Sequence, residues 1–195
     1  TIYINTAERR LYLVLGNGQA LQYGIGVGRD GFRWSGTHRI SAKKEWPSWT
    51  PPAQMLRRRP DLPRHMAGGV DNPLGARALY LYQGNKDTLF RIHGTNQPEY
   101  IGASISSGCI RMTNEDVIDL YSRVKQGTVV VVLEPKQGDS PYNSKMALQG
   151  GGNFELADRK GVADTQHGHP VSLNRLEQIG TRASVRQLSH PVVGR

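Results

Sequence analysis

The sequence contains little that could cross-link the chain or hold it in a membrane. Its 195 residues include a single cysteine, Cys109, so no disulfide can form within the chain. That thiol is an inert buried group, a reactive group or one partner of an intermolecular bridge. No apolar run approaches the roughly 18 residues that a membrane-spanning helix needs. We therefore expect a soluble globular fold with no integral membrane segment.

Acidic residues are scarce relative to basic ones. The chain has 25 Lys and Arg against 16 Asp and Glu, and residues 1–112 hold 15 of the basic residues but only 7 of the acidic ones. Such a charge favours a polyanionic partner, which could be nucleic acid, an anionic lipid surface or a cell-wall polymer. Nucleic acid is disfavoured, because no recognisable binding module is present and aromatic residues do not alternate with basic ones on any evident face.

A metal-binding pattern is also missing. His167 and His169 lie close together, but no second group of ligand residues at a fixed spacing accompanies them. We therefore expect no metal site.

Short strands dominate the first part of the chain. Residues 1–29 predict an antiparallel meander of three strands, with turns at Ala7–Arg9 and at the Gly-Asn-Gly of residues 16–18. Residues 77–82 and 88–95 predict two more strands joined by a tight turn, which places His93 at a strand end. Between these regions, residues 31–76 hold all three tryptophans and six of the eleven prolines without a sustained apolar period. We expect a long insertion or irregular loop there.

A helix is predicted directly after the cysteine. Thr113 is a candidate N-cap with Asp116 three residues later, and Gly127 is a candidate stop. Apolar residues recur between them at helical spacing: Val117, Leu120, Tyr121 and Val124. The short β-branched run of residues 128–134 then predicts a buried strand. We assign residues 1–135 to one catalytic domain, and residues 136–195 to an extension that is weakly structured or wraps around it.

Cys109 and His93 are a candidate nucleophile and base. A free thiol is mostly protonated at neutral pH, and a nearby imidazole can take its proton. Cys109 follows His93 by 16 positions, which is enough for the chain to return and place Cys109 beside the strand that ends at His93. The base also needs an acceptor that orients its ring, and the backbone carbonyl of Gly94 could serve.

The residues around the cysteine suit an acyl-transfer site. Gly108 permits a sharp turn, and the amides of Gly108 and Cys109 could converge as an oxyanion hole. Arg111 could bind a carboxylate through its guanidinium. Considered alone, these residues are equally compatible with a buried structural thiol and a surface arginine before a helix.

Two segments taken together indicate one class of protein more specifically than any of these residues alone. "IHGT" at residues 92–95 followed by "SSGCIRM" at residues 106–112 resembles the signature of the L,D-transpeptidases, bacterial enzymes of the cell wall. The resemblance covers roughly residues 1–135. It implies that Cys109 is the nucleophile, His93 the base, the Gly94 carbonyl its orienting group and Arg111 a residue that holds the site or a substrate carboxylate. Ser107 stands where the commonest form of the motif has histidine.

The resemblance also implies a fold and a reaction. The expected fold is mainly β with minor α: a mixed β-sheet sandwich with one principal helix after the catalytic cysteine. The expected reaction is attack on a peptidoglycan tetrapeptide stem, loss of the terminal D-alanine and a thioester that an amine or water resolves. The amine could belong to another stem, a D-amino acid or an envelope protein. No metal or organic cofactor is required, and a carbapenem is expected to acylate Cys109.

Other expectations concern the location and the substrate groove. A role in the cell wall implies export to the periplasm or cell envelope. Because the chain begins at Thr1, we expect any export signal to lie upstream. Trp46 and Trp49 could stack on sugar or line the stem-peptide site, although packing beneath a long loop is the commoner explanation for such residues. The alternatives to a transpeptidase are an L,D-carboxypeptidase and a noncatalytic wall-binding module.

Overall fold

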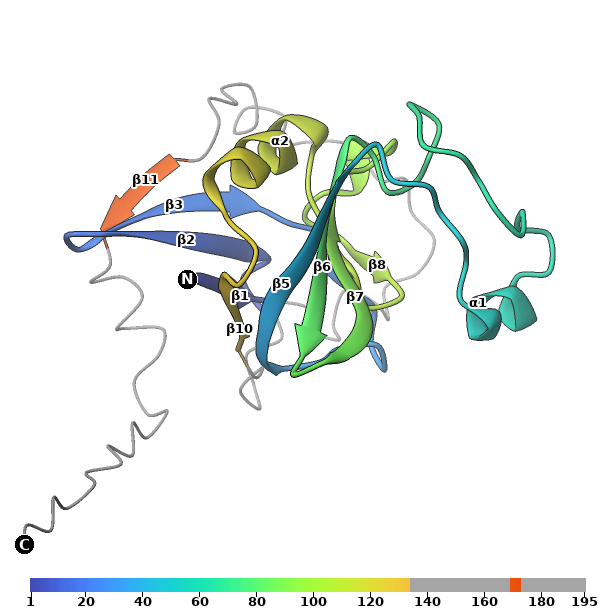
Figure 1. The fold of residues 1–195 in the computed structure, drawn as a ribbon, viewed down its shortest axis with the longest axis horizontal. Helices are drawn as coiled ribbons and strands as arrows, with labels where there is room; N and C mark the ends of the chain where they lie inside the picture. Colours follow the sequence, from blue (N-terminus) through green and yellow to red (C-terminus); the bar gives the residue numbers. More distant parts are fainter. Residues whose placement is uncertain (134–168, 173–195) are drawn as a thin grey trace, which may run out of the picture.

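A mixed β-sheet forms most of the molecule. The computed structural model describes residues 1–133 and 169–172. The nine strands of the main sheet follow the order β11-β3-β2-β1-β10-β5-β6-β7-β9, and β4 and β8 form a separate pair (Figure 1). The sheet curls around an apolar core to which nearly every strand contributes. The expected mainly β fold with a mixed sheet is confirmed.

The N-terminal meander is present as expected. Strands β1 (Ile2–Asn5), β2 (Arg10–Gly16) and β3 (Gln19–Gly24) pair antiparallel in chain order. Strand β10 (Val129–Val132) lies parallel to β1. Alternate residues of this region, such as Ile2 and Ile4, are fully buried, because successive side chains of a strand point to opposite faces.

The expectation that residues 31–76 form one irregular insertion was wrong. Residues Gly36–Glu45 form β5, the longest strand, which pairs antiparallel with β10 on one side and with β6 on the other. Its buried positions are His38 and Ile40, between exposed polar residues. The alternation was missed because one of those buried side chains is a histidine. The irregular part is confined to residues 46–76, which project from the sheet and include the short helix α1 (Ala53–Arg58) (Figure 1).

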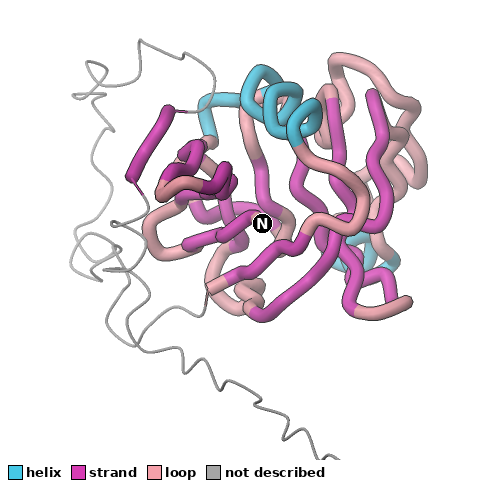
Figure 2. Tube along the Cα trace, turned by 60° about the vertical axis from the view of Figure 1, so that its left-hand side comes forward, coloured by secondary structure: helices cyan, strands magenta, loops and turns pink. Residues whose placement is uncertain are grey.

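Strand β6 (Arg77–Gln83) and β7 (Lys86–His93) form the predicted hairpin, and His93 is the last residue of β7. Helix α2 (Asn114–Arg123) packs against both strands (Figure 2). Its N-cap is Thr113, whose hydroxyl accepts from the Asp116 amide at 3.1 Å. The helix ends at Arg123, before Gly127, and Lys43 Nζ donates to the carbonyls of Tyr121 and Val124 at its C-terminus, at 2.6 and 2.7 Å.

The chain segment that carries the cysteine is held from two sides. Strand β8 (Ser104–Ser106) lies parallel to β4 (Val27–Gly28), and β9 (Ile110–Arg111) lies parallel to the end of β7. A 3₁₀ turn, Pro98–Tyr100, precedes β8. The amide of Arg111 donates to the Gly26 carbonyl, and the Arg111 carbonyl accepts the return bond from the Gly26 amide, both at 2.9 Å. Backbone hydrogen bonds therefore hold residues 104–111 between residues 26–28 on one side and the end of β7 on the other.

The C-terminal extension lies mostly outside the described residues. Its described part, β11 (His169–Ser172), pairs antiparallel with the outer edge of β3. The proposed boundary at residue 135 and the nature of residues 136–195 stay predictions. Within residues 1–133 and 169–172, no helix is both long enough and apolar enough to cross a membrane.

Candidate active site

Strand register brings the predicted catalytic residues to one face of the sheet. In the parallel pairing of β7 and β9, His93 lies opposite Arg111 and Ile92 opposite Ile110. Cys109 precedes Arg111 by two residues, so the side-chain alternation of strands favours the same face for all three. Ile92 and Ile110 point the other way and are buried in the core. The core thus anchors the strands whose opposite face carries the predicted catalytic residues.

His93 is buried and neutral at neutral pH. Its side chain is 4% exposed, and Nδ1 lies 2.6 Å from the Gly94 carbonyl oxygen, the contact expected from the sequence. Because that carbonyl is an acceptor, Nδ1 carries the proton and Nε2 keeps its lone pair. The pKa of His93 is lowered to about 4, mainly by burial; the charges of Arg111 and Arg91 contribute to the lowering, and backbone hydrogen bonds with Gly94 and Leu74 oppose it.

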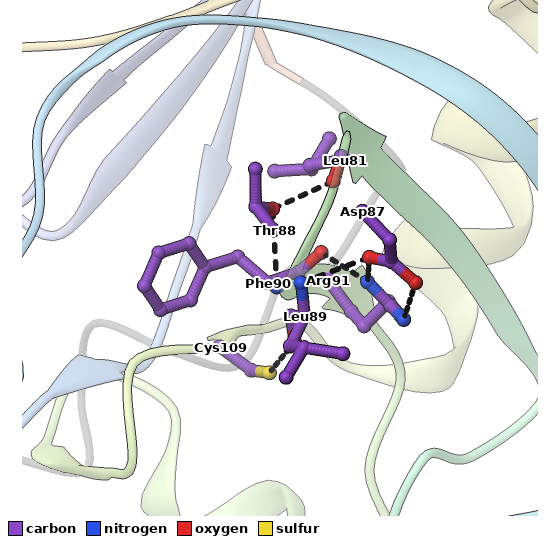
Figure 3. A network of polar contacts seen from close by, with 7 residues as sticks. All are labelled: Leu81, Asp87, Thr88, Leu89, Phe90, Arg91 and Cys109. Carbon is purple, nitrogen blue, oxygen red and sulfur yellow. Dashed lines mark hydrogen bonds and ion pairs between the residues drawn. The ribbon is translucent and has the colours of Figure 1, made fainter. Parts of the chain in front are cut away.

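The Cys109 thiol is half-buried and protonated in this state. Its Sγ donates to the carbonyl oxygen of Leu89 at 3.9 Å (Figure 3). Burial raises the pKa of Cys109, while the backbone amide of Arg91 and the charges of Arg91 and Arg111 lower it. The two guanidinium groups therefore act on both His93 and Cys109, which places the ring and the sulfur in one electrostatic environment.

Within residues 1–133, no hydrogen bond joins His93 to Cys109, and the thiol donates to the Leu89 carbonyl instead. The expected hydrogen bond between ring and sulfur therefore stays a prediction. Catalytic hydrogen bonds are often long in unliganded sites and tighten when substrate binds. A rotation about the Cα–Cβ bond of Cys109 redirects its sulfur without moving the backbone.

Arg111 has unused hydrogen-bonding capacity. Within the described part of the chain, its Nη1 is a buried side-chain nitrogen with no hydrogen-bond partner. Burial lowers the pKa of Arg111, and the neighbouring Cys109 raises it. An unpaired nitrogen of a buried cation is costly, so an incoming anionic group is favoured at this position. By contrast, Arg91 already pairs with Asp87 at 2.7 Å (Figure 3). Its guanidinium also lies over the Tyr80 ring.

The turn before the cysteine differs in one respect from the predicted oxyanion hole. The Gly108 amide donates to Ser106 Oγ at 3.2 Å, and Ser106 Oγ in turn donates to the Cys109 carbonyl at 2.6 Å. The Gly108 amide is therefore occupied. The Cys109 amide has no hydrogen-bond partner within residues 1–133 and is the remaining donor of the predicted pair.

Gly108 itself could not be replaced without distortion. Its φ of +114° lies in the region that L side chains rarely adopt, and a Cβ atom would meet Phe90 Cε1 at 2.7 Å. Gly94 is constrained for a different reason, since a Cβ there would lie 2.3 Å from Asn114 Oδ1. Gly94 and Gly108, which have no side chain, thus let the Asn114 and Phe90 side chains approach the backbone closely.

The remaining predicted residues are less closely connected to the sulfur. Ser107 is half-buried beside Gly108. Trp46, which is 42% exposed, and the half-buried Trp49 belong to the projecting residues 46–76. Their backbones pair with Ala76 and Met66, and no polar or ring contact among the described residues joins either indole to His93 or Cys109. Their substrate-binding role stays a prediction.

Sequence reasoning missed a bulge in β7 beside the cysteine. Tyr80 pairs with Arg91 and Tyr82 with Asp87, so Leu81 alone faces residues 88–90. The extra residues place Leu89 at φ +63° with its side chain 61% exposed and its carbonyl toward the thiol. Thr88 Oγ1 secures the bulge by donating to the Leu81 carbonyl at 2.6 Å (Figure 3). Bulges often occur next to active sites, where they redirect a group.

Asn114 was also missed. Its Oδ1 accepts from the amides of Ala76 and Thr95 at 2.9 and 3.3 Å. It therefore ties the start of helix α2 to the residues that follow His93 and to the end of the projecting segment. No local sequence signal announces this role, because Asn114 resembles any polar residue in a first helical turn.

Metal ligands are not grouped in the described part of the chain. Residues 1–133 and 169–172 contain no cluster of three or more His, Cys, Asp or Glu side chains that could hold a metal ion.

Comparison with known proteins identifies the family. The family model of the L,D-transpeptidase catalytic domain, YkuD, matches residues 1–132. The chain therefore belongs to the L,D-transpeptidase family, whose members are transferases that act on peptidoglycan. This agrees with the predicted signature around His93 and Cys109.

Curated relatives carry the same description. The chain is 37% identical over 142 residues to the probable L,D-transpeptidase YbiS of Escherichia coli K12, a match that covers 68% of this chain and 44% of that protein. It is 30% identical over 136 residues to the putative L,D-transpeptidase YqjB of Bacillus subtilis, covering 68% of this chain and 70% of the relative. The chain thus spans less than half the length of YbiS.

A solved structure of the family has a similar fold. An L,D-transpeptidase from Mycobacterium smegmatis superimposes with a TM-score of 0.52 at 18% identity, covering 68% of this chain and 58% of the other. A Brucella melitensis structure described as a probable carnitine operon oxidoreductase is 55% identical, covers 68% of this chain and 85% of the other, and has a TM-score of 0.46. The family assignment depends on the family model and the curated relatives.

Proposed function

We propose that this protein is an L,D-transpeptidase that acts on peptidoglycan tetrapeptide stems through a thioester on Cys109. The observation that carries the proposal is the shared environment of a neutral buried imidazole at the end of β7 and the only cysteine, directly before the adjoining strand β9, within a chain of this family. A neutral imidazole is the form that can accept a proton, and the lowered pKa of His93 keeps the ring in that form at neutral pH.

The first half of the reaction forms the thioester. His93 Nε2 takes the thiol proton, and the sulfur attacks the carbonyl of the diaminopimelate or lysine residue of the stem. The charges of Arg91 and Arg111 favour the thiolate, as their effect on the Cys109 pKa indicates. The imidazolium is stabilised by the Gly94 carbonyl. It returns its proton to the nitrogen of the departing D-alanine as the carbon–nitrogen bond breaks.

The second half resolves the thioester. An acceptor amine attacks, His93 takes the proton of that amine, and the sulfur leaves to regain a proton. The acceptor is another stem, a D-amino acid or an amine of an envelope protein. Water in place of the amine gives an L,D-carboxypeptidase, the alternative that shares the same acyl-enzyme. Neither half requires a metal or an organic cofactor.

The two remaining positions of the site have proposed roles in binding. Arg111 would take a stem carboxylate with its unpaired Nη1, and the Cys109 amide would donate to the oxyanion. The basic charge of the domain suits a polyanionic wall in the periplasm or cell envelope. Residues 1–135 would form the catalytic domain.

The test is product analysis with a matched variant. The full chain is incubated with disaccharide-tetrapeptide, with and without a D-amino acid, and products are identified by mass spectrometry. Wild type should exchange the terminal D-alanine, whereas Cys109→Ser, which changes one atom, should release none. Equal product from both proteins would remove the nucleophile assignment. Release of D-alanine without amine incorporation would identify a carboxypeptidase, and binding without turnover by either protein would identify a wall-binding module.

A carbapenem provides an independent readout. Ertapenem should add one adduct to wild type and none to Cys109→Ser, as measured by intact-protein mass spectrometry. The catalytic domain of an Enterococcus faecium L,D-transpeptidase, one of the solved structures that this chain resembles in fold, is acylated by ertapenem.

A further inference from the structure

Trp34 lies against the turn that carries the nucleophile. Its indole Nε1 donates to the carbonyl oxygen of Gly108 at 2.6 Å, across 74 residues of sequence. The ring stacks on Phe90 with centroids 4.2 Å apart and planes 3° apart. Its edge meets His38 at 4.8 Å with an interplanar angle of 77°. The indole thus lies against both rings, with its N–H group directed at the Gly108 carbonyl.

The Gly108 carbonyl and the Cys109 amide belong to the same peptide unit. A trans peptide is planar, and its C=O and N–H groups point in opposite directions. Residues 1–133 contain no cis peptide bond. The bond from Trp34 to the carbonyl therefore sets the direction of the Cys109 N–H, which points away from the indole. Within that same range this N–H has no protein acceptor, so it is available to a ligand.

The next peptide unit is held independently. Ser106 Oγ donates to the Cys109 carbonyl at 2.6 Å. Rotation of the Gly108–Cys109 peptide is thus the main freedom left in the turn, because Gly108 carries no side chain that would restrict it. The indole N–H restrains this freedom through a single hydrogen bond.

We infer that Trp34 is a positioning residue that aims the Cys109 amide at the oxyanion formed when the sulfur attacks an acyl carbonyl. This inference rests on the proposed acyl-transfer function. An oxyanion donor stabilises the transition state only when it is aligned with the charge that develops there. Removing one such donor outright slows catalysis by about 10²–10³-fold. Loosening the donor without removing it should cost less, about tenfold in the rate of acylation.

Trp34→Phe removes the N–H group and keeps an aromatic ring for stacking. Phe90→Leu is the matched control, because it removes the stacking partner and leaves the indole N–H in place. A second variant replaces Trp34 by benzothienylalanine, which has the same fused rings with sulfur in place of N–H. This variant retains the packing if Trp34→Phe does not fold.

Two reactions of Cys109 separate alignment of the amide from reactivity of the thiol. Single-turnover acylation by ertapenem builds an oxyanion, whereas alkylation by iodoacetamide displaces iodide from a methylene carbon and builds none. Both rates are measured on the full chain by intact-protein mass spectrometry. In Trp34→Phe and the benzothienylalanine variant, acylation should slow about tenfold, while alkylation stays within about twofold of wild type. In Phe90→Leu, acylation should slow less than threefold.

Other outcomes would overturn the inference. An unchanged acylation rate in both Trp34 variants would show that the hydrogen bond does not align the amide. Equal slowing of acylation and alkylation, or an equal effect of Phe90→Leu, would show that Trp34 acts through packing alone. If wild type is alkylated but neither ertapenem nor the tetrapeptide acylates it, the proposed function fails, and the inference fails with it.

Discussion

The buried neutral state of His93 predicts a specific loss of stability in mild acid. The pKa of an exposed histidine is 6.5, and that of His93 in the folded protein is about 4. Between these values the unfolded chain binds a proton that the folded protein does not, so stability falls as the pH falls. Above pH 6.5 both states are neutral and the contribution is constant. Below pH 4 both are protonated and the loss is complete.

The pKa difference sets the size of this effect. A shift from 6.5 to about 4 corresponds to roughly 3 kcal/mol in full, of which about 2 kcal/mol is lost between pH 7 and pH 5. The perturbation is His93→Gln, which keeps a donor for the Gly94 carbonyl and has no titration in this range. His38, whose pKa burial also lowers, is present in both proteins, so its contribution cancels.

The assay is urea denaturation of wild type and His93→Gln at pH 7 and pH 5, followed by tryptophan fluorescence. Wild type should lose about 2 kcal/mol more than the variant between the two pH values. A loss of the same size in both proteins would refute the depressed pKa. It would also remove the argument that His93 is ready to accept a proton at neutral pH.

Three further perturbations test other parts of the structure. Gly108→Ala should lower the free energy of unfolding by about 1–3 kcal/mol in denaturant titration. The added Cβ would lie 2.7 Å from Phe90 Cε1, and φ at this position is +114°. Unchanged stability would argue against this close packing. Arg111→Gln should reduce kcat/KM about tenfold on a stem with a free diaminopimelate carboxylate and much less on the amidated stem; equal losses would exclude carboxylate binding. Lys43→Met should lower the free energy of unfolding by about 1–2 kcal/mol, because Lys43 Nζ caps the C-terminus of helix α2. The rate of acylation by ertapenem should stay unchanged. A slower rate would connect this cap to the active site.

Local patterns predicted the elements whose signals lie within a few residues. The meander, the hairpin ending at His93 and the capped helix after Cys109 all appear where alternation, turn residues and Thr113 indicated them. The Gly94 carbonyl contact was predictable for the same reason, since Gly94 directly follows His93. Each of these features depends on covalent neighbours, whose relative positions the chain itself restricts.

Strand β5 could not be predicted in this way. Few of its residues are apolar, and its stability depends on pairing with β10 and β6, which are distant in sequence. The bulge at Leu89 could not be predicted either, because it is a shift of register between two paired strands, β6 and β7. Pairing partners and register are properties of the assembled sheet.

The sequence by itself determined which residues are the candidates for the chemistry, since a single cysteine and a histidine in two linked motifs leave few alternatives. The tertiary structure alone decided how their backbone is arranged. Ser106 occupies the Gly108 amide, Trp34 holds the Gly108 carbonyl, and the thiol faces the bulged carbonyl of Leu89. Hydrogen bonds between groups up to 74 residues apart form only when folding has brought the strands together, so no local pattern encodes them.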